Sequence, residues 1–162
     1  HFRSYYARLE QSALQKDAPG SYAILEFLGN NEEEKHYSSE GMLLWENGNS
    51  NFNQPTMGYA DGSDVSSFIY TNRGWTANNM MLYMESHDEE RLMYKNVNFG
   101  SVSGGYSTKD TTTALKRMAQ NAAFLLGMPG PKMIWQFGEL GYDYPINYCP
   151  DGSINDNCRT SN

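Results

Sequence analysis

Residues that can act as general acids or bases lie within or just after three of the apolar runs in this sequence. They are Glu26 within residues 22–28, His87-Asp88 just after residues 79–84, and Glu139 just after residues 132–137. Nearly continuous apolar runs of this length are typical of strands in a parallel sheet. Since ligands bind at the carboxyl ends of such strands, these acids form a candidate active site. The structural alternative for Glu26 is a helix cap or an ion pair.

Paired carboxylates with aromatic and polar neighbours favour cleavage of a glycosidic bond. One carboxylic acid protonates the leaving oxygen, and a carboxylate attacks or stabilises the cationic transition state. The chain has 12 Tyr and 3 Trp among 14% aromatic residues. Aromatic faces suit sugar binding, but a large α/β core uses them equally well.

The elements expected around these acids alternate between helix and strand. Helices are expected at residues 2–16, 30–40, 61–70 and 110–126, strands at 22–28, 42–45, 79–84 and 132–137, and loops at 46–62 and 92–106. This alternation predicts an α/β fold with parallel strands and right-handed crossovers. A complete eight-stranded α/β barrel needs about 250 residues, whereas four strands account for about half of one.

Composition excludes several classes of partner and of site. The 162 residues carry a formal net charge of -7 without a basic stripe, so nucleic acid is an unsuitable ligand. No apolar run is long enough to predict a transmembrane helix, and the first residues do not form a signal peptide. Cys149 and Cys158 can form a disulfide suited to an exported protein or remain two thiols, but their spacing does not predict a zinc ribbon.

Three segments then resemble the α-amylase family, glycoside hydrolase family 13. They are Ala23-Ile24-Leu25-Glu26, Tyr83-Met84-Glu85-Ser86-His87-Asp88, and the segment from Pro129 to Gly141 that contains Gly138-Glu139. They resemble the family's fifth, seventh and eighth barrel-strand motifs and occur in that order. The resemblance implies a partial catalytic barrel over residues 1–162, consisting of the second half of a (β/α)8 barrel, strands five to eight with their helices.

The resemblance also implies roles for individual residues. Glu26 would be the general acid/base, and Asp88 the second carboxylate, which binds sugar hydroxyls and stabilises the transition state. His87 and Arg91 would contact the substrate. Trp45 would offer a sugar platform, or it is a core residue beneath the expected loop. The implied ligand is an α-glucan or malto-oligosaccharide, with no cofactor.

The chain departs from the family's pattern at two places. Ser86 stands where the family usually has Asn, and no Gly-Phe-Arg-x-Asp-like motif supplies the nucleophile. We therefore expect a fragment that is inactive alone, with open barrel edges that favour self-association. A metal site is not expected, because adjacent residues on an extended chain, such as His87 and Asp88, point apart.

The alternatives within and beyond this family stay open at this point. A branching or transglycosylating enzyme shares the same motifs. A degenerate, non-catalytic barrel that binds sugar fits the missing nucleophile, and an unrelated small α/β protein would use its strand-end acids structurally. Export is suggested only by the two cysteines and by a polymeric substrate.

Overall fold

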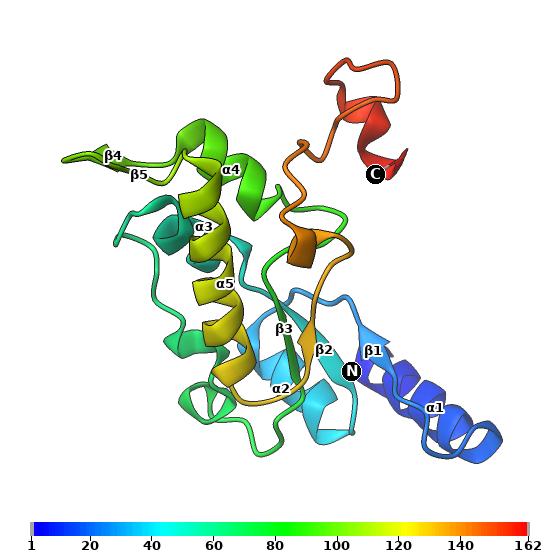
Figure 1. Ribbon diagram of the computed structural model, residues 1–162. Coiled ribbons are helices and arrows are strands. Elements are labelled where there is room, and N and C mark those ends of the chain that lie inside the picture. Colours follow the sequence, from blue (N-terminus) through cyan, green and yellow to red (C-terminus); the bar gives the residue numbers. More distant parts are fainter. Residues whose placement is uncertain (1, 162) are drawn as a thin grey trace. The chain divides into compact units, whose positions relative to one another are not determined.

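The computed structural model describes residues 2–161, with side chains for residues 5–159. Four strands form one sheet in the order β1-β2-β3-β6, comprising β1 (Ile24–Leu25), β2 (Leu43–Asn47), β3 (Met80–Tyr83) and β6 (Lys132–Met133) (Figure 1). β1 pairs with β2 in parallel, with Ile24 opposite Leu43 and Leu25 opposite Leu44. The predicted α/β class with a parallel sheet is therefore confirmed. Expected self-association through the outer strands β1 and β6 stays a prediction.

The chain divides into two compact units. The first unit contains the chain up to Glu46, Ser66–Leu82 and Met128–Lys132. The second unit contains Asn47–Val65, Tyr83–Gly127 and the chain from Met133 onward. None of the helices within residues 2–161 combines the length and apolar character needed to cross a lipid bilayer.

The first unit holds most of the sheet together with helices α1 (Phe2–Asp17) and α2 (Asn31–Ser39). Its core is a cluster of apolar side chains from α1, α2, strands β2 and β3 and the segments beside them: Ala7, Tyr37, Met42, Leu44, Trp75 and Met80. Asn30 is the N-cap of α2, because its side chain accepts hydrogen bonds from the backbone N–H groups of Glu32 and Glu33, both at 3.1 Å.

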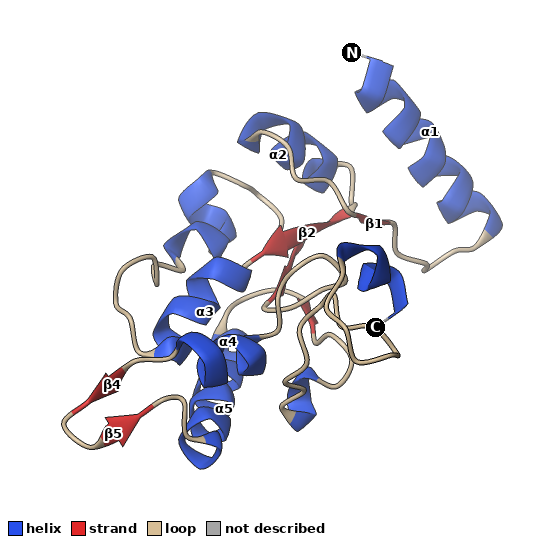
Figure 2. Ribbon diagram, turned by 90° about the horizontal axis from the view of Figure 1, so that it is seen from above, coloured by secondary structure: helices blue, strands red, loops and turns tan. Residues whose placement is uncertain are grey.

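The second unit is built on three helices that pack against one another, α3 (Asn49–Met57), α4 (Leu92–Phe99) and α5 (Thr111–Gly127). A short hairpin of β4 (Val102–Ser103) and β5 (Tyr106–Ser107) projects from them (Figure 2). The helix predicted at 110–126 is confirmed as α5. Asp110 caps it, since the Thr113 N–H donates to Asp110 Oδ1 at 2.9 Å.

The loop predicted at residues 46–62 is wrong. β2 continues to Asn47, and Asn49–Met57 forms α3. The buried residues of α3 are Phe52, Asn53, Thr56 and Met57, which recur at helical spacing. Two of these four residues, Asn53 and Thr56, are polar. A search for apolar residues at helical spacing therefore does not detect this helix in a segment rich in Asn.

The loop predicted at residues 92–106 is also wrong, because α4 and the β4–β5 hairpin occupy it. Helix α4 begins where the Leu92 N–H donates to the Glu85 carboxylate at 2.7 Å. This acceptor lies seven residues earlier in the chain, outside the local window in which helix starts are recognised.

Three further expectations require correction. The strand predicted at 132–137 is limited to β6, Lys132–Met133. Residues 61–70, predicted as a helix, give only the 3₁₀ turns Ser66–Phe68 and Tyr70–Arg73, held by bonds of the i+3 type such as Ile69 N–H to the Ser66 carbonyl. The strand predicted at 22–28 is limited to two residues, and Ile24 is 49% exposed. β1 is an outer strand of the sheet, and its apolar run is therefore not covered on both faces.

Candidate active site

Glu26 directly follows β1 and is exposed to solvent. It lines a shallow groove of the first unit, together with Tyr6, Phe27 and Tyr37. The alternative in which Glu26 caps the next helix is wrong, because Asn30 is the cap of α2. An exposed carboxyl group at the carboxyl end of a parallel strand is placed where a ligand can reach it.

Trp45 lies on β2 and is half-buried. Residues of β2 alternate between buried and half-buried, and Leu44 and Glu46 are on the buried side. The pairing of β1 with β2 ends at Leu25 and Leu44, and Glu26 and Trp45 are the residues that follow these two partners. Trp45 as a sugar platform stays a prediction.

Sequence reasoning missed a buried ionic cluster in the first unit. Arg73 Nη1 donates to both Glu46 oxygens, at 2.8 and 2.9 Å, and Nη2 donates to Glu34. Arg73 Nε donates to Asn31 Oδ1 at 2.8 Å, and Trp75 Nε1 donates to the same oxygen at 2.9 Å. The guanidinium also lies over the Trp75 ring, 4.7 Å from its centroid. One cation thus joins α2, β2 and the 3₁₀ turn of residues 70–73.

This cluster contains two carboxylates and one guanidinium. Burial raises the pKa of Glu46 from 4.5 to about 7; Arg73 opposes this rise and the charge of Glu34 adds to it. The sequence does contain a signal for Glu46. Met42, Leu44 and Glu46 are all buried and recur with the period of two that a strand requires. Assigning Glu46 to a loop concealed that pattern.

His87 and Asp88 lie in the second unit, in the loop between β3 and α4, and both side chains are exposed. The expectation that they point apart is wrong, because His87 Nε2 lies 3.6 Å from Asp88 Oδ2. The chain turns here instead of remaining extended, since the Asp88 N–H donates to Ser86 Oγ at 3.1 Å. The His87 ring also lies 6.0 Å from the Trp135 ring, centroid to centroid.

A buried ion pair flanks this loop. Glu85 and Arg91 have side chains only 4% and 3% exposed, and Arg91 Nη1 lies 3.6 Å from Glu85 Oε2. Arg91 Nη1 also donates to the Gln136 carbonyl at 3.1 Å, and its guanidinium lies 5.0 Å from the centroid of the Tyr142 ring. The two ends of the loop that carries His87 and Asp88 are therefore held together inside the protein.

These contacts give Arg91 a structural role. A guanidinium buried in this way presents almost no surface to a sugar. The expected contact between Arg91 and the substrate therefore stays a prediction, and the burial of Arg91 does not support it. Burial raises the pKa of Glu85, while the hydrogen bond from Leu92 and the charge of Arg91 oppose that rise. A Cβ atom at residue 138 would lie 2.3 Å from Glu85 Oε2, so a larger residue than Gly138 would displace this carboxylate.

Further polar contacts fasten the loop to the start of α3. Glu89 accepts hydrogen bonds from the Ser86 hydroxyl and from the Asn47 amide. Asn49 Nδ2 donates to the carbonyls of Met84 and Glu90, at 2.8 and 2.9 Å. Ser86, which departs from the family's Asn, is thus buried and bonded within the second unit. The third predicted strand-end acid, Glu139, is exposed in the 3₁₀ turn Gly138–Leu140.

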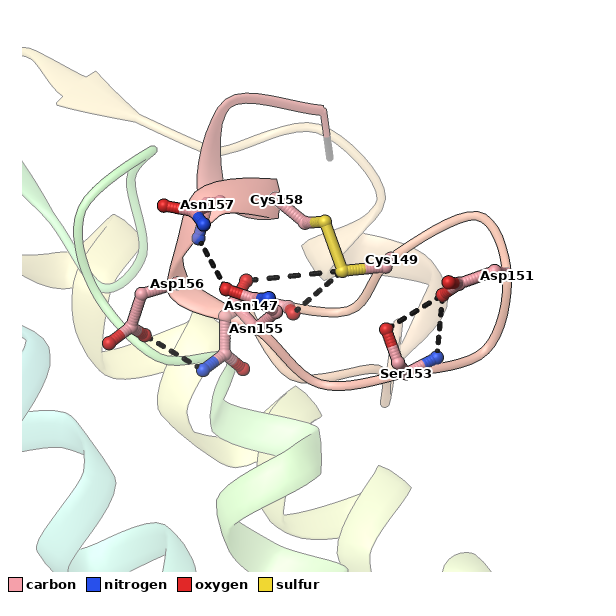
Figure 3. The surroundings of a disulfide bond; sticks show 8 residues. All are labelled: Asn147, Cys149, Asp151, Ser153, Asn155, Asp156, Asn157 and Cys158. Carbon is pink, nitrogen blue, oxygen red and sulfur yellow. Dashed lines mark hydrogen bonds between the residues drawn. A yellow bond between two sulfur atoms is a disulfide. The ribbon is translucent and has the colours of Figure 1, made fainter.

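A disulfide closes the loop near the C-terminal end of the second unit. Cys149 and Cys158 are bonded, with their Cα atoms 5.2 Å apart, so the alternative of two thiols is wrong (Figure 3). Asp151 Oδ1 accepts from the Ser153 N–H and hydroxyl at 2.9 and 2.7 Å, and Asn147 Nδ2 donates to Asp156 Oδ1 at 3.0 Å. Arg159, next to Cys158, donates to the backbone carbonyl of Asp88.

Comparison with models of known protein families and with curated proteins found no match to this chain.

Proposed function

We propose that this chain carries the general acid/base and one further carboxylate of an α-amylase-type glycosidase that acts on α-glucans. Glu26 would protonate the glycosidic oxygen, while Asp88 and His87 would hydrogen-bond the sugar in the cleavage subsite. The observation that carries the proposal is the loop in which His87 and Asp88 are exposed between the buried partners Glu85 and Arg91. Catalytic groups need this kind of fixed presentation.

The contrast between buried and exposed acids supports this division of roles. Glu85 is buried and committed to Leu92 and Arg91, whereas Asp88, three residues later, is 61% exposed at its side chain. Glu26 is likewise exposed, whereas Glu46 on the neighbouring strand is buried against Arg73. The buried acids maintain the structure, and the exposed acids remain accessible to a ligand.

In this proposal, the chain lacks one of the two carboxylates that a retaining glycosidase needs for hydrolysis. A retaining glycosidase needs a nucleophilic carboxylate in addition to its acid, and the family's nucleophile motif does not occur among these 162 residues. The chain should therefore bind malto-oligosaccharide without hydrolysing it. This missing motif also favours one second candidate, a non-catalytic sugar-binding protein. A branching or transglycosylating activity would use the same residues.

The test is calorimetric titration of the whole chain with maltoheptaose, with a starch hydrolysis assay on the same preparation. We expect wild-type binding that Asp88→Asn weakens at least tenfold, with no hydrolysis. Asp61→Asn is the matched control, since Asp61 is an exposed aspartate of the same unit outside this loop. Equal affinity of wild type and Asp88→Asn would refute the role of Asp88. Starch hydrolysis by the chain would refute the claim that it lacks a group needed for catalysis.

A further inference from the structure

Four aromatic side chains form a row in the second unit, between β6 and the disulfide. The ring centroids of Phe137 and Tyr142 are 6.1 Å apart, those of Tyr142 and Tyr144 are 5.4 Å apart, and those of Tyr144 and Tyr148 are 4.5 Å apart. Phe137 is 50% exposed and Tyr144 is 45% exposed. The rings pack on one another and still present apolar surface to solvent.

Phe137 has an unfavourable backbone conformation. With φ at 65° and ψ at -3°, it is the one non-glycine residue with positive φ in the part of the chain that the structure describes. An L-residue with a Cβ atom is strained in this region. The Phe137 carbonyl maintains the turn by accepting from the N–H groups of Leu140 and Tyr142, at 3.1 and 3.2 Å.

Phenylalanine at position 137 carries a backbone cost that glycine would not. Glycine would relieve the backbone strain, and a half-exposed ring contributes less to the core than a buried one would. Strained backbone conformations persist where the surrounding structure fixes them, and they cluster at active sites and ligand-binding segments. We therefore take Phe137 as the first indication of a binding surface.

The row is also held in place before any ligand arrives. The guanidinium of Arg91 lies over the Tyr142 ring and is itself held by the buried Glu85. At the other end, Tyr148 precedes Cys149 of the disulfide and forms an isolated β-bridge with Ile154. Preorganised rings lose little conformational entropy on binding, which favours affinity.

The chemistry around the rings indicates the class of ligand. Exposed Asp143 lies between Tyr142 and Tyr144, and the half-buried Asn147 precedes Tyr148. Apolar faces interleaved with carboxylate, amide and phenol groups match a sugar chain, whose rings have C–H faces and hydroxyl edges. The Arg159 side chain, beside the disulfide, reaches the backbone of Asp88 and so connects this surface with the loop that carries Asp88.

We propose that the row formed by Phe137, Tyr142, Tyr144 and Tyr148 binds a stretch of an α-glucan chain that extends beyond the sugar contacted by Asp88. The identity of the sugar rests on the proposed function. The row itself rests on the exposed rings and on the strained backbone at Phe137.

The test compares Phe137→Gly with wild type in two measurements, calorimetric affinity for maltoheptaose and the thermal midpoint of unfolding, Tm. We expect at least tenfold weaker binding with Tm unchanged or raised, because glycine removes the ring and relieves the strain. Tyr144→Ala should also weaken binding. Phe124→Ala is the control, since Phe124 is a 60% exposed ring on α5 outside the row, and it should bind as wild type does.

The outcomes separate this proposal from the proposed function. If Phe137→Gly binds as wild type does and Asp88→Asn binds weakly, the proposal that the row binds glucan is refuted, while the proposed function is still supported. Weak binding in Phe137→Gly with unchanged affinity in Asp88→Asn would support the row and refute the role of Asp88. A clear fall in the Tm of Phe137→Gly would show a structural ring and overturn the row. If wild type binds no maltoheptaose, both proposals fail.

Discussion

The stability of the first unit should fall as the pH rises toward neutrality, and Glu46→Gln should reduce that fall. Arg73 is one guanidinium between the buried carboxylates of Glu34 and Glu46. With both carboxylates ionised, the cluster would carry a net negative charge away from water, which is unfavourable. Burial, and to a smaller extent the charge of Glu34, therefore favours a proton on Glu46 and raises its pKa to about 7 against the opposing charge of Arg73.

The sign follows from the difference between the folded and unfolded states. The folded protein keeps the Glu46 proton up to about pH 7, whereas the unfolded chain releases it near the ordinary pKa of 4.5. The contribution of Glu46 to stability is therefore fully present below pH 4.5 and is lost as the pH rises through about 7. At about 1.4 kcal/mol per unit of pKa shift, the rise from 4.5 to about 7 sets an upper limit of about 3.5 kcal/mol on this loss. We expect about 1–2 kcal/mol, because water and side-chain motion screen part of the interaction.

The assay is urea unfolding at several values between about pH 5 and about pH 8, followed by tryptophan fluorescence. Trp75 is 3% exposed and lies against Arg73, so it reports on this cluster. Glu46→Gln should keep an acceptor for Arg73 and show a flatter dependence on pH. Glu32→Gln, an exposed acid at the start of α2, should keep the wild-type slope. Equal slopes for wild type and Glu46→Gln, or a wild type that gains stability with rising pH, would refute the reasoning.

Three further predictions concern the second unit. Glu85→Ala leaves the buried Arg91 without its carboxylate and should lower the free energy of unfolding by about 3–5 kcal/mol in urea titration, whereas a change below about 1 kcal/mol would mean that the pair is not buried as described. Asn96→Leu should raise the free energy of unfolding by about 1–3 kcal/mol, because Asn96 is fully buried and neither of its amide atoms has a hydrogen-bond partner among the described residues; a destabilised variant would contradict this. Replacing both Cys149 and Cys158 with Ser should cost about 2–3 kcal/mol and lower the Tm, because the disulfide closes a short loop; an unchanged Tm would show that the loop is ordered without it.

Elements defined by local signals could be predicted from the sequence. Helix α5 has a capping Asp110 and a continuous apolar stripe, and α2 has its capping Asn30. The strands β2 and β3 follow from apolar runs near the middle of the sheet. These features depend on neighbouring residues, so a single sequence contains them.

Other features depend on contacts between distant residues, and the sequence did not reveal them. Helix α4 starts on the carboxylate of Glu85, and the cluster at Arg73 needs Glu34 and Glu46, which are 39 and 27 residues away. For the candidate site, the sequence singled out Glu26, His87 and Asp88, which are exposed in the structure. It did not predict the burial of Arg91, because an arginine three residues after an aspartate looks the same whether its partner is a sugar or Glu85.

The most direct test of the central claim is a crystal structure of the whole chain with maltoheptaose bound. We predict that the Glu26 and Asp88 carboxyl groups both lie within hydrogen-bonding distance of the oligosaccharide, Glu26 near a glycosidic oxygen and Asp88 near ring hydroxyls. An oligosaccharide bound elsewhere, with neither carboxyl group in contact, would contradict the claim that these two residues belong to a glucan-cleaving site.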